Sequence, residues 1–148
     1  MIECIHMNKI TIENIVNAPI EKVWKYWNEP EHITKWAFAS DDWESPHAEN
    51  DLKKNGRFLT RMAAKDGSVS FDLLGTYTNV IPNELIEYIM DAFPGEEVGR
   101  AVSISFESIG DATKIIETFD SENENSEEMQ RAGWQAILDN FKKHAETN

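Results

Sequence analysis

The middle of the chain alternates apolar and polar residues in several short segments, and this pattern limits the fold more than any other feature. The segments begin near Phe58, Phe71, Ile86, Val102 and Ala112. A period of two is typical of strands that bury one face and expose the other. Turn sequences separate the segments at residues 66–67, 81–83, 93–95 and 110–111. Strands joined by such short turns pair with their neighbours in sequence, so an antiparallel meander is predicted.

The residues before this meander predict one more strand and two short helices. Isoleucine alternates with polar residues at the start of segment 9–16, which indicates a half-buried strand. Pro19 and Pro30 each suit the first turn of a helix, because an N–H would have no hydrogen-bond partner there. Residues 37–56 show no clear periodicity, and the pairs Asp41-Asp42 and Ser45-Pro46 within them favour a loop.

A long helix is predicted from about Ser126 to His144. Serine is a good N-cap, and the helix dipole favours the two glutamates that follow it. The apolar residues cover about half of the circumference, which is more than a helix on a flat sheet needs. They are Met129, Gly133, Trp134, Ala136, Ile137, Leu138, Phe141 and Ala145. We therefore expect an α+β fold in which a curved antiparallel sheet wraps around this helix and leaves a cavity between them.

The length and composition fit a single domain over residues 1–148, with residues 1–8 as a frayed tail. The apolar fraction of 41% is enough for a core at this length. The sequence contains 14 basic and 27 acidic residues, so the net charge is −13. This charge argues against binding to nucleic-acid phosphates and against an anionic membrane surface. The sequence has neither a membrane-spanning run nor an N-terminal signal peptide, so a cytoplasmic protein is expected.

The sequence offers little for metal, cofactor or nucleophile chemistry. The single cysteine, Cys4, lies in the predicted tail, where only His6 is near enough to activate it. We expect His32 on a helix surface and His144 at a helix C-terminus, where the dipole favours a cation. These three histidines and His47 lack the spacing of a metal site, and no glycine pattern for phosphate binding occurs. Neither a metal nor a cofactor is therefore predicted.

Several strings resemble one known family. They are Asn17-Ala18-Pro19-Ile20-Glu21-Lys22-Val23-Trp24, the stretch from Trp27 to Trp36, Gly75-Thr76-Tyr77, Glu117-Thr118-Phe119-Asp120 and the stretch from Gly133 to Phe141. With the order of the segments, they resemble the START-like superfamily, also called helix-grip, SRPBCC or Bet v-like. Within it the chain is similar to the branch of activator of heat-shock-protein ATPase homologues, which is grouped with polyketide cyclases. The resemblance spans about residues 9–145 and implies the helix-grip fold.

Three functions are the alternatives, and the first is the leading one because the last helix has a wide apolar arc and the strands have aromatic faces. The first is a binding protein that holds a hydrophobic ligand, such as a lipid, polyketide or flavonoid, between the sheet and the last helix. The second is an enzyme of the polyketide cyclase type, which orients a reactive substrate and transfers a proton. The third is a chaperone ATPase cofactor, for which the resemblance covers only the C-terminal type of domain. Exposed sheet edges and the segment around Trp43 could also join two copies as a homodimer.

Aromatic and apolar residues are the candidates for the wall of such a cavity. Aromatic side chains suit flat or lipid-like ligands, although their commoner role is to fill a core. On the strands, alternation selects the residues that face the helix if the apolar side points inward. The predicted ligand-binding residues are Trp36, Phe38, Trp43, Phe58, Met62, Phe71, Leu73, Tyr88, Met90, Ile104, Phe106, Trp134, Leu138 and Phe141.

Glu117, Tyr88 and Arg61 are the candidates for proton transfer or polar anchoring in the cavity, without a convincing dyad. Ile115 shares a face of the last strand with Glu117, whereas Ile116 lies on the other face, so the orientation is ambiguous. If Glu117 points inward, it is a carboxyl group in an apolar cavity with a raised pKa. The scarcity of buried carboxylates favours the outward orientation, with a cross-strand pair.

Overall fold

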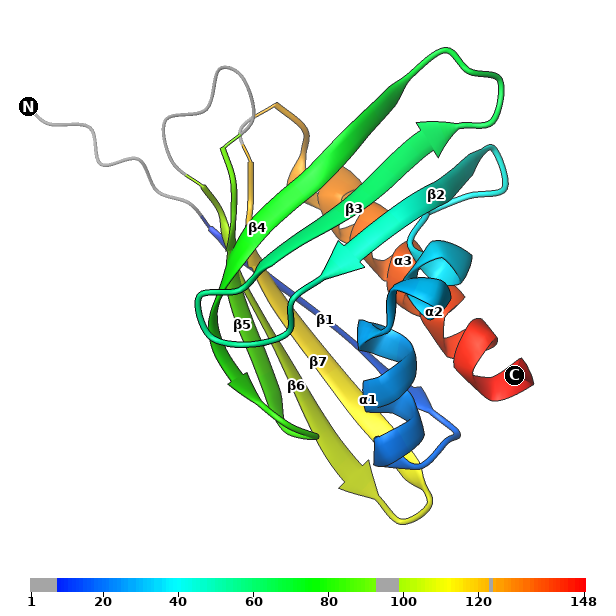
Figure 1. The fold of residues 1–148 in the computed structure, drawn as a ribbon, viewed down its shortest axis with the longest axis vertical. Coiled ribbons are helices and arrows are strands. Elements are labelled where there is room, and N and C mark those ends of the chain that lie inside the picture. The colour runs from blue at the N-terminus through cyan, green and yellow to red at the C-terminus, as the bar shows by residue number, and fades with distance from the viewer. Residues whose placement is uncertain (1–7, 93–98, 123) are drawn as a thin grey trace, which may run out of the picture.

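Seven antiparallel strands form one sheet, in the order β1-β7-β6-β5-β4-β3-β2. The computed structural model describes residues 8–92, 99–122 and 124–148. The strands are β1 (Lys9–Val16), β2 (Trp43–Asn50), β3 (Arg57–Ala64), β4 (Ser70–Ile81), β5 (Leu85–Met90), β6 (Ala101–Ile109) and β7 (Ala112–Asp120). The helices are α1 (Ile20–Asn28), α2 (Pro30–Trp36) and α3 (Glu127–Thr147). The sheet is strongly curved, and the helices lie on its concave side (Figure 1).

This arrangement is the α+β helix-grip fold predicted from the sequence. Strands β2 to β7 pair with their sequence neighbours as a meander, and β1 pairs with β7 at the opposite edge from β2. The turn between β3 and β4 contains Gly67, whose φ of 80° lies in a region that glycine adopts without steric cost. The hairpin predicted there is confirmed, and so are the two short helices after the first strand.

The core lies between the β1–β7–β6 part of the sheet and helices α1 and α3. Strand β1 contributes Ile10 and Ile12, as its alternation predicts, and α3 contributes Leu138 and Phe141. Trp27 of α1 contacts Phe141 edge-on, with ring centroids 4.8 Å apart. Burying an apolar side chain of this size stabilises the fold by about 1.5–3 kcal/mol. The C-terminal half of α3 is thus held against α1 and the sheet.

The predicted loop over residues 37–56 is wrong in its middle, because β2 forms there as an edge strand. Pro46 cannot donate a backbone hydrogen bond, and an edge strand tolerates this because it pairs on one side only. The register with β3 shifts between Glu44 and His47, which places an irregularity around the proline. A proline in an edge strand is hard to tell from a proline in a loop by sequence pattern.

Helix α3 begins where the sequence predicts, but the residue that is buried in its first turn is not the predicted one. The Ser126 hydroxyl accepts a hydrogen bond from the Met129 N–H at 3.1 Å and so caps the helix. Met129 belongs to the predicted apolar arc, yet its side chain is 64% exposed. Gln130 is buried instead, because its side-chain amide bonds to backbone groups of Glu122 and Asn125. Polar contacts therefore tie the first turn of α3 to the preceding loop.

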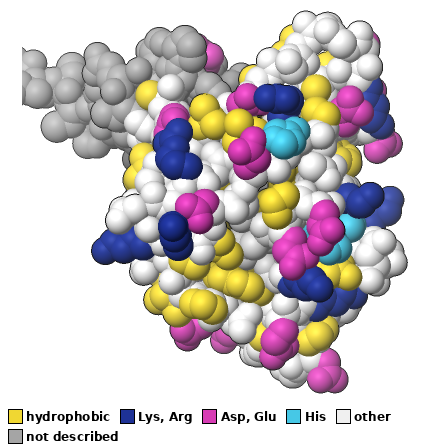
Figure 2. All heavy atoms as spheres, in the orientation of Figure 1, with side chains coloured by type: hydrophobic (Ala, Val, Ile, Leu, Met, Phe, Trp, Pro, Cys, Tyr) yellow, Lys and Arg dark blue, Asp and Glu magenta, His cyan; other side chains and the backbone are white. Residues whose placement is uncertain are grey.

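The surface mixes acidic, basic and apolar side chains on the face seen in Figure 2. None of the described helices is long and apolar enough to cross a bilayer. Apart from Asn8, the predicted frayed tail over residues 1–8 lies outside the described residues, and Cys4 and His6 lie there with it. The predicted turn at residues 93–95 also lies outside them.

Candidate functional site

A cavity of about 340 Å³ lies between the concave face of the sheet and the helices. The strands contribute Glu49, Asn50, Phe58, Thr60, Met62, Phe71, Leu73, Tyr77, Ile86, Tyr88, Met90 and Glu117 to its wall. The helices contribute Trp27, Asn28, Ile33, Trp36, Trp134 and Ile137, and Ala37 and Arg100 lie at element ends. Aromatic and aliphatic side chains thus make up most of the wall.

Part of the predicted ligand-binding set lines this cavity. The members that do so are Trp36, Phe58, Met62, Phe71, Leu73, Tyr88, Met90 and Trp134. On β3, β4 and β5 the alternation therefore identifies side chains that face the concave side of the sheet. Contact of these residues with a ligand stays a prediction.

The rest of that set lies outside the cavity wall. Those that fill the adjacent core are Ile104, Phe106, Leu138 and Phe141. Phe38 lines a separate hollow beside α3, and Trp43 contacts Phe71 edge-on at the start of β2, with ring centroids 5.9 Å apart. Only the N-terminal half of α3 faces the cavity, because α1 covers its C-terminal half. The apolar arc predicted for this helix runs along both halves and cannot tell them apart.

Several residues of the wall were not predicted from the sequence. Tyr77 lies on the same side of β4 as Leu73, and Ile86 lies on the same side of β5 as Tyr88, so the alternation could have included both. Ile137 of α3 belongs to the apolar arc predicted for that helix. No sequence pattern marked Asn28 at the end of α1 or Asn50 at the end of β2 as a cavity residue, because their position at the cavity depends on the tertiary fold.

One end of the cavity is held by a chain of satisfied hydrogen bonds. The Tyr77 hydroxyl donates to Asn50 Oδ1, and Asn50 Nδ2 donates to the Asn28 carbonyl oxygen at 2.8 Å. Asn28 Nδ2 in turn donates to the Trp24 carbonyl oxygen at 2.9 Å. Burial is the main reason that the pKa of Tyr77 lies well above its ordinary value. These groups connect β4, β2 and α1 and already have their partners.

Glu117 points into the cavity, so the outward orientation favoured from the sequence is wrong. In register beside it lie Ile12 on β1 and Ile104 on β6, both buried. Its own side chain is 6% exposed, and it makes no hydrogen bond or ion pair with any residue that the structure describes. Burial without a partner raises the pKa of this carboxyl group to about 8.

The orientation of β7 follows from its other inward side chains. Ile115 and Phe119 lie two residues before and after Glu117, on the same face of β7, and both are fully buried. Phe119 stacks on Trp134 of α3 with ring centroids 3.8 Å apart. Turning the strand over would expose these two side chains in order to solvate one carboxylate. The burial of Glu117 is therefore a consequence of the residues on either side of it.

Tyr88 is a further polar residue of the cavity wall, and its hydroxyl has no hydrogen bond to a described residue. Its ring contacts Phe58 edge-on, with centroids 4.8 Å apart. Burial, with a smaller contribution from Glu117, raises the pKa of Tyr88 well above 10. Arg61, the third polar candidate, lies outside the wall and binds Asp72 through two contacts of 2.8 and 3.2 Å.

The histidines on α2 and α3 contact each other, which the sequence did not predict. His32 Nδ1 lies 3.0 Å from His144 Nε2, and the His32 ring stacks on Tyr26 with centroids 3.8 Å apart. His144 is buried, and burial, together with His32, lowers its pKa. The expectation that His144 serves as a helix-end cation is corrected, because burial favours the neutral ring.

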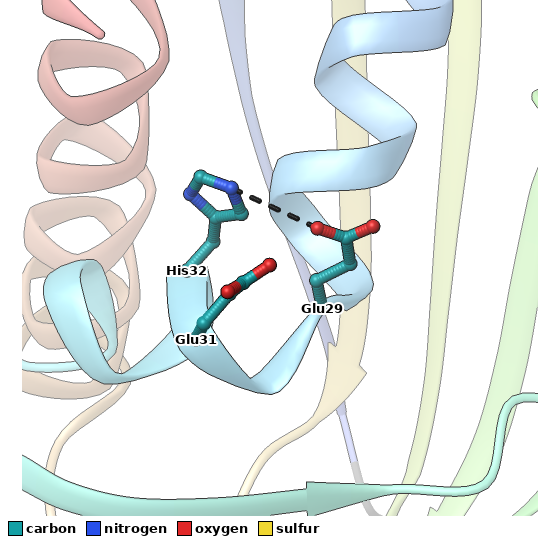
Figure 3. Close-up of side chains that lie close together, drawn as sticks. All are labelled: Glu29, Glu31 and His32. Atoms are coloured by element: carbon teal, nitrogen blue, oxygen red, sulfur yellow. Dashed lines mark ion pairs between the residues drawn. The ribbon is translucent and has the colours of Figure 1, made fainter.

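Glu29, Glu31 and His32 form a small cluster at the start of α2 (Figure 3). Their ligating atoms lie within 4.8 Å of one another, and His32 Nε2 is 3.8 Å from a Glu29 carboxylate oxygen. None of the three lines the cavity, and Glu31 is exposed. Partly exposed acidic groups often cluster without an ion, so the absence of a metal site stays a prediction.

Comparison with known proteins agrees with this fold. Residues 17–146 match the family model of Activator of Hsp90 ATPase homolog 1-like proteins. The chain belongs to this family. The START-like resemblance and the branch predicted from the sequence are thereby confirmed. No curated protein matches the chain.

Solved structures of other proteins extend the comparison. An Activator of Hsp90 ATPase homolog 1-like protein from Aeromonas hydrophila is 43% identical, with a TM-score of 0.86, over 95% of this chain and 93% of its own. Chr148 from Cytophaga hutchinsonii is 56% identical, with a TM-score of 0.77, over the same shares. CalU16 from Micromonospora echinospora is 19% identical, with a TM-score of 0.67, over 93% of this chain and 75% of its own, and shares the fold.

Proposed function

We propose that this protein binds a hydrophobic small molecule in the cavity between the sheet and the helices. The size of this cavity, about 340 Å³, and its aromatic wall support the proposal. Small-molecule sites in proteins are concave, mostly apolar and usually about 300–1,000 Å³ in volume. A core filled by its own side chains leaves few voids larger than a water molecule. A cavity of this size therefore favours a bound occupant.

The character of the wall narrows the class of ligand. Rings from Phe58, Tyr88 and Trp134 come from three different elements and offer flat apolar surfaces. Met62 and Met90 add flexible thioethers, which adapt to ligands of irregular shape. A ring-containing apolar molecule fits this wall better than a sugar or a nucleotide, which would leave its polar groups without partners.

Blocking the cavity tests the proposal. We expect naphthalene derivatives to raise the melting temperature of the wild-type protein, and Met62→Trp, which places an indole in the cavity wall, should abolish this rise. Met129→Trp is the matched control, because the Met129 side chain is exposed on α3, and it should leave that rise unchanged. Equal rises in wild-type protein and both variants would place the binding outside the cavity and contradict the proposal.

An enzyme that transfers a proton is the second candidate, and Glu117 is the observation that favours it. A carboxyl group whose pKa is about 8 can exchange a proton near neutral pH. A polyketide cyclase type of reaction would use the cavity to orient a flexible substrate around this group. Unchanged turnover of a confirmed substrate in Glu117→Gln would contradict this role. The chaperone partner, the homodimer and the cytoplasmic location stay predictions.

A further inference from the structure

We propose that Glu117 binds the ligand as a neutral carboxylic acid that donates a hydrogen bond, so the ligand is an apolar ring compound bearing a carbonyl oxygen. This inference rests on the proposed function, because it concerns the same cavity. It adds a polar specificity element to an otherwise apolar wall. Such an element decides which of many apolar molecules is held and in which orientation.

The geometry around Glu117 points to a ligand group as its partner. Its carboxyl group lines the cavity, is almost completely buried and bonds to no residue that the structure describes. Ile12 and Ile104 flank it on the neighbouring strands, so neither strand offers a polar side chain at that level of the sheet. Buried polar groups in proteins are normally hydrogen-bonded, and the Glu117 carboxyl group faces the space of the cavity. A ligand oxygen in the cavity would supply the partner that the described residues do not.

The protonation state decides which ligand group fits. Because burial raises the pKa of Glu117 to about 8, the group is mostly the neutral acid at pH 7. The acid O–H donates to a carbonyl oxygen, and no charge has to be buried. A cationic amine would require an ionised Glu117, and the desolvation of two buried charges offsets much of their attraction. The Tyr88 hydroxyl adds a second donor on the same wall.

The other ionisable groups on the wall allow the pH dependence to be assigned. Glu49 lies on β2, Arg100 precedes β6, and Tyr77 and Tyr88 lie on β4 and β5. Burial raises the pKa of both tyrosines above the ordinary value of 10. The tyrosines thus stay neutral below pH 9, and no histidine is among the described residues of the wall. Repeating the pH titration of ligand affinity in Glu49→Gln tests whether Glu49 contributes to the pH dependence.

Two matched probes test the inference in the intact protein. 2-Acetylnaphthalene carries a carbonyl group, and 2-ethylnaphthalene replaces that group with a methylene of similar shape. Dissociation constants are measured by tryptophan fluorescence for wild-type protein, Glu117→Leu and Glu117→Gln. We expect the dissociation constant for 2-ethylnaphthalene, divided by that for 2-acetylnaphthalene, to fall about five- to tenfold in Glu117→Leu. This change corresponds to the loss of one buried hydrogen bond. Glu117→Gln keeps an N–H donor and should retain most of the preference for the ketone.

The pH dependence has a definite sign. In the wild-type protein, affinity for the ketone should be about tenfold weaker at pH 9 than at pH 7, because Glu117 ionises and loses its donor. Glu117→Gln should remove this dependence, and the exposed control Glu107→Gln should retain it. Affinity for 2-ethylnaphthalene should not weaken in parallel.

The outcomes separate this inference from the proposed function. An unchanged ratio in Glu117→Leu, or ketone affinity that rises with pH, would overturn the inference. In either case, binding of both naphthalenes would leave the proposed function standing. If neither naphthalene bound saturably, both would be overturned. Melting curves of each variant establish that it is folded before binding is interpreted.

Discussion

At the scale of single residues, Glu117 shows how packing can override the solvation of a charged group. Its neighbours on the inner face of β7, Ile115 and Phe119, are fully buried and fix the orientation of the strand. The sequence identified Glu117 as a candidate but could not orient it, because Ile116 makes the other face of the strand apolar as well. Which face is buried depends on the tertiary contact with Trp134 of α3, which stacks on Phe119.

The buried acid predicts an unusual dependence of stability on pH. The pKa of Glu117 is about 8 in the folded protein, against an ordinary value of 4.5 for a solvated glutamate, so the unfolded state releases its proton first as the pH rises. The free energy of unfolding should therefore fall by about 3 kcal/mol between pH 5 and pH 8 through this group alone. Urea denaturation of wild-type protein and Glu117→Gln measures the difference.

The variant provides the contrast that isolates this group. Glu117→Gln cannot ionise, so its stability relative to the wild-type protein should rise steadily from pH 5 to pH 8. Glu107→Gln removes an exposed carboxylate from β6 and should show no such trend. Parallel curves for wild-type protein and Glu117→Gln would mean that Glu117 is solvated in the folded protein.

At the scale of elements, periodicity predicted most of the strands and the last helix, and local chemistry decided the exceptions. β2 was missed because Pro46 and the acidic residues before it have the composition of a loop. The fit between β3 and β4 depends on Gly75, which leaves room for the ring of Phe58. A Cβ added at Gly75 would lie 2.4 Å from a carbon of that ring. An alternating pattern cannot reveal such a close approach between strands.

Gly75→Ala should therefore destabilise the protein and alter the cavity. The added methyl group must displace Phe58, which lines the cavity, or strain β4, and overpacking of this kind costs about 1–3 kcal/mol. Gly133→Ala is the matched control, because a Cβ there meets nothing within 4 Å. It should stabilise α3 by about 0.5–1 kcal/mol. Urea denaturation would contradict this account if both variants changed stability in the same direction.

At the scale of the whole molecule, the helix-grip architecture could be predicted, but the division between core and cavity could not. Phe141 and Trp134 lie on the same helix and belong to one predicted apolar arc. Phe141 is buried against Trp27 of α1, whereas Trp134 reaches the cavity. This division depends on where α1 and α2 cover the sheet, which no local pattern encodes. For the same reason, alternation placed both Tyr88 and Phe106 on the inner face of the sheet but could not show that only Tyr88 lines the cavity.

The methionine methyl groups offer the most direct test that the cavity holds a small apolar molecule. Met62 and Met90 line the cavity, whereas Met129 is exposed on α3 and serves as an internal control. With ¹³C-labelled methionine methyl groups, a nuclear magnetic resonance titration with 2-acetylnaphthalene should shift the Met62 and Met90 signals saturably with one dissociation constant. The Met129 signal should stay in place. Unchanged Met62 and Met90 signals at saturating probe, or shifts at Met129 alone, would contradict ligand binding in this cavity.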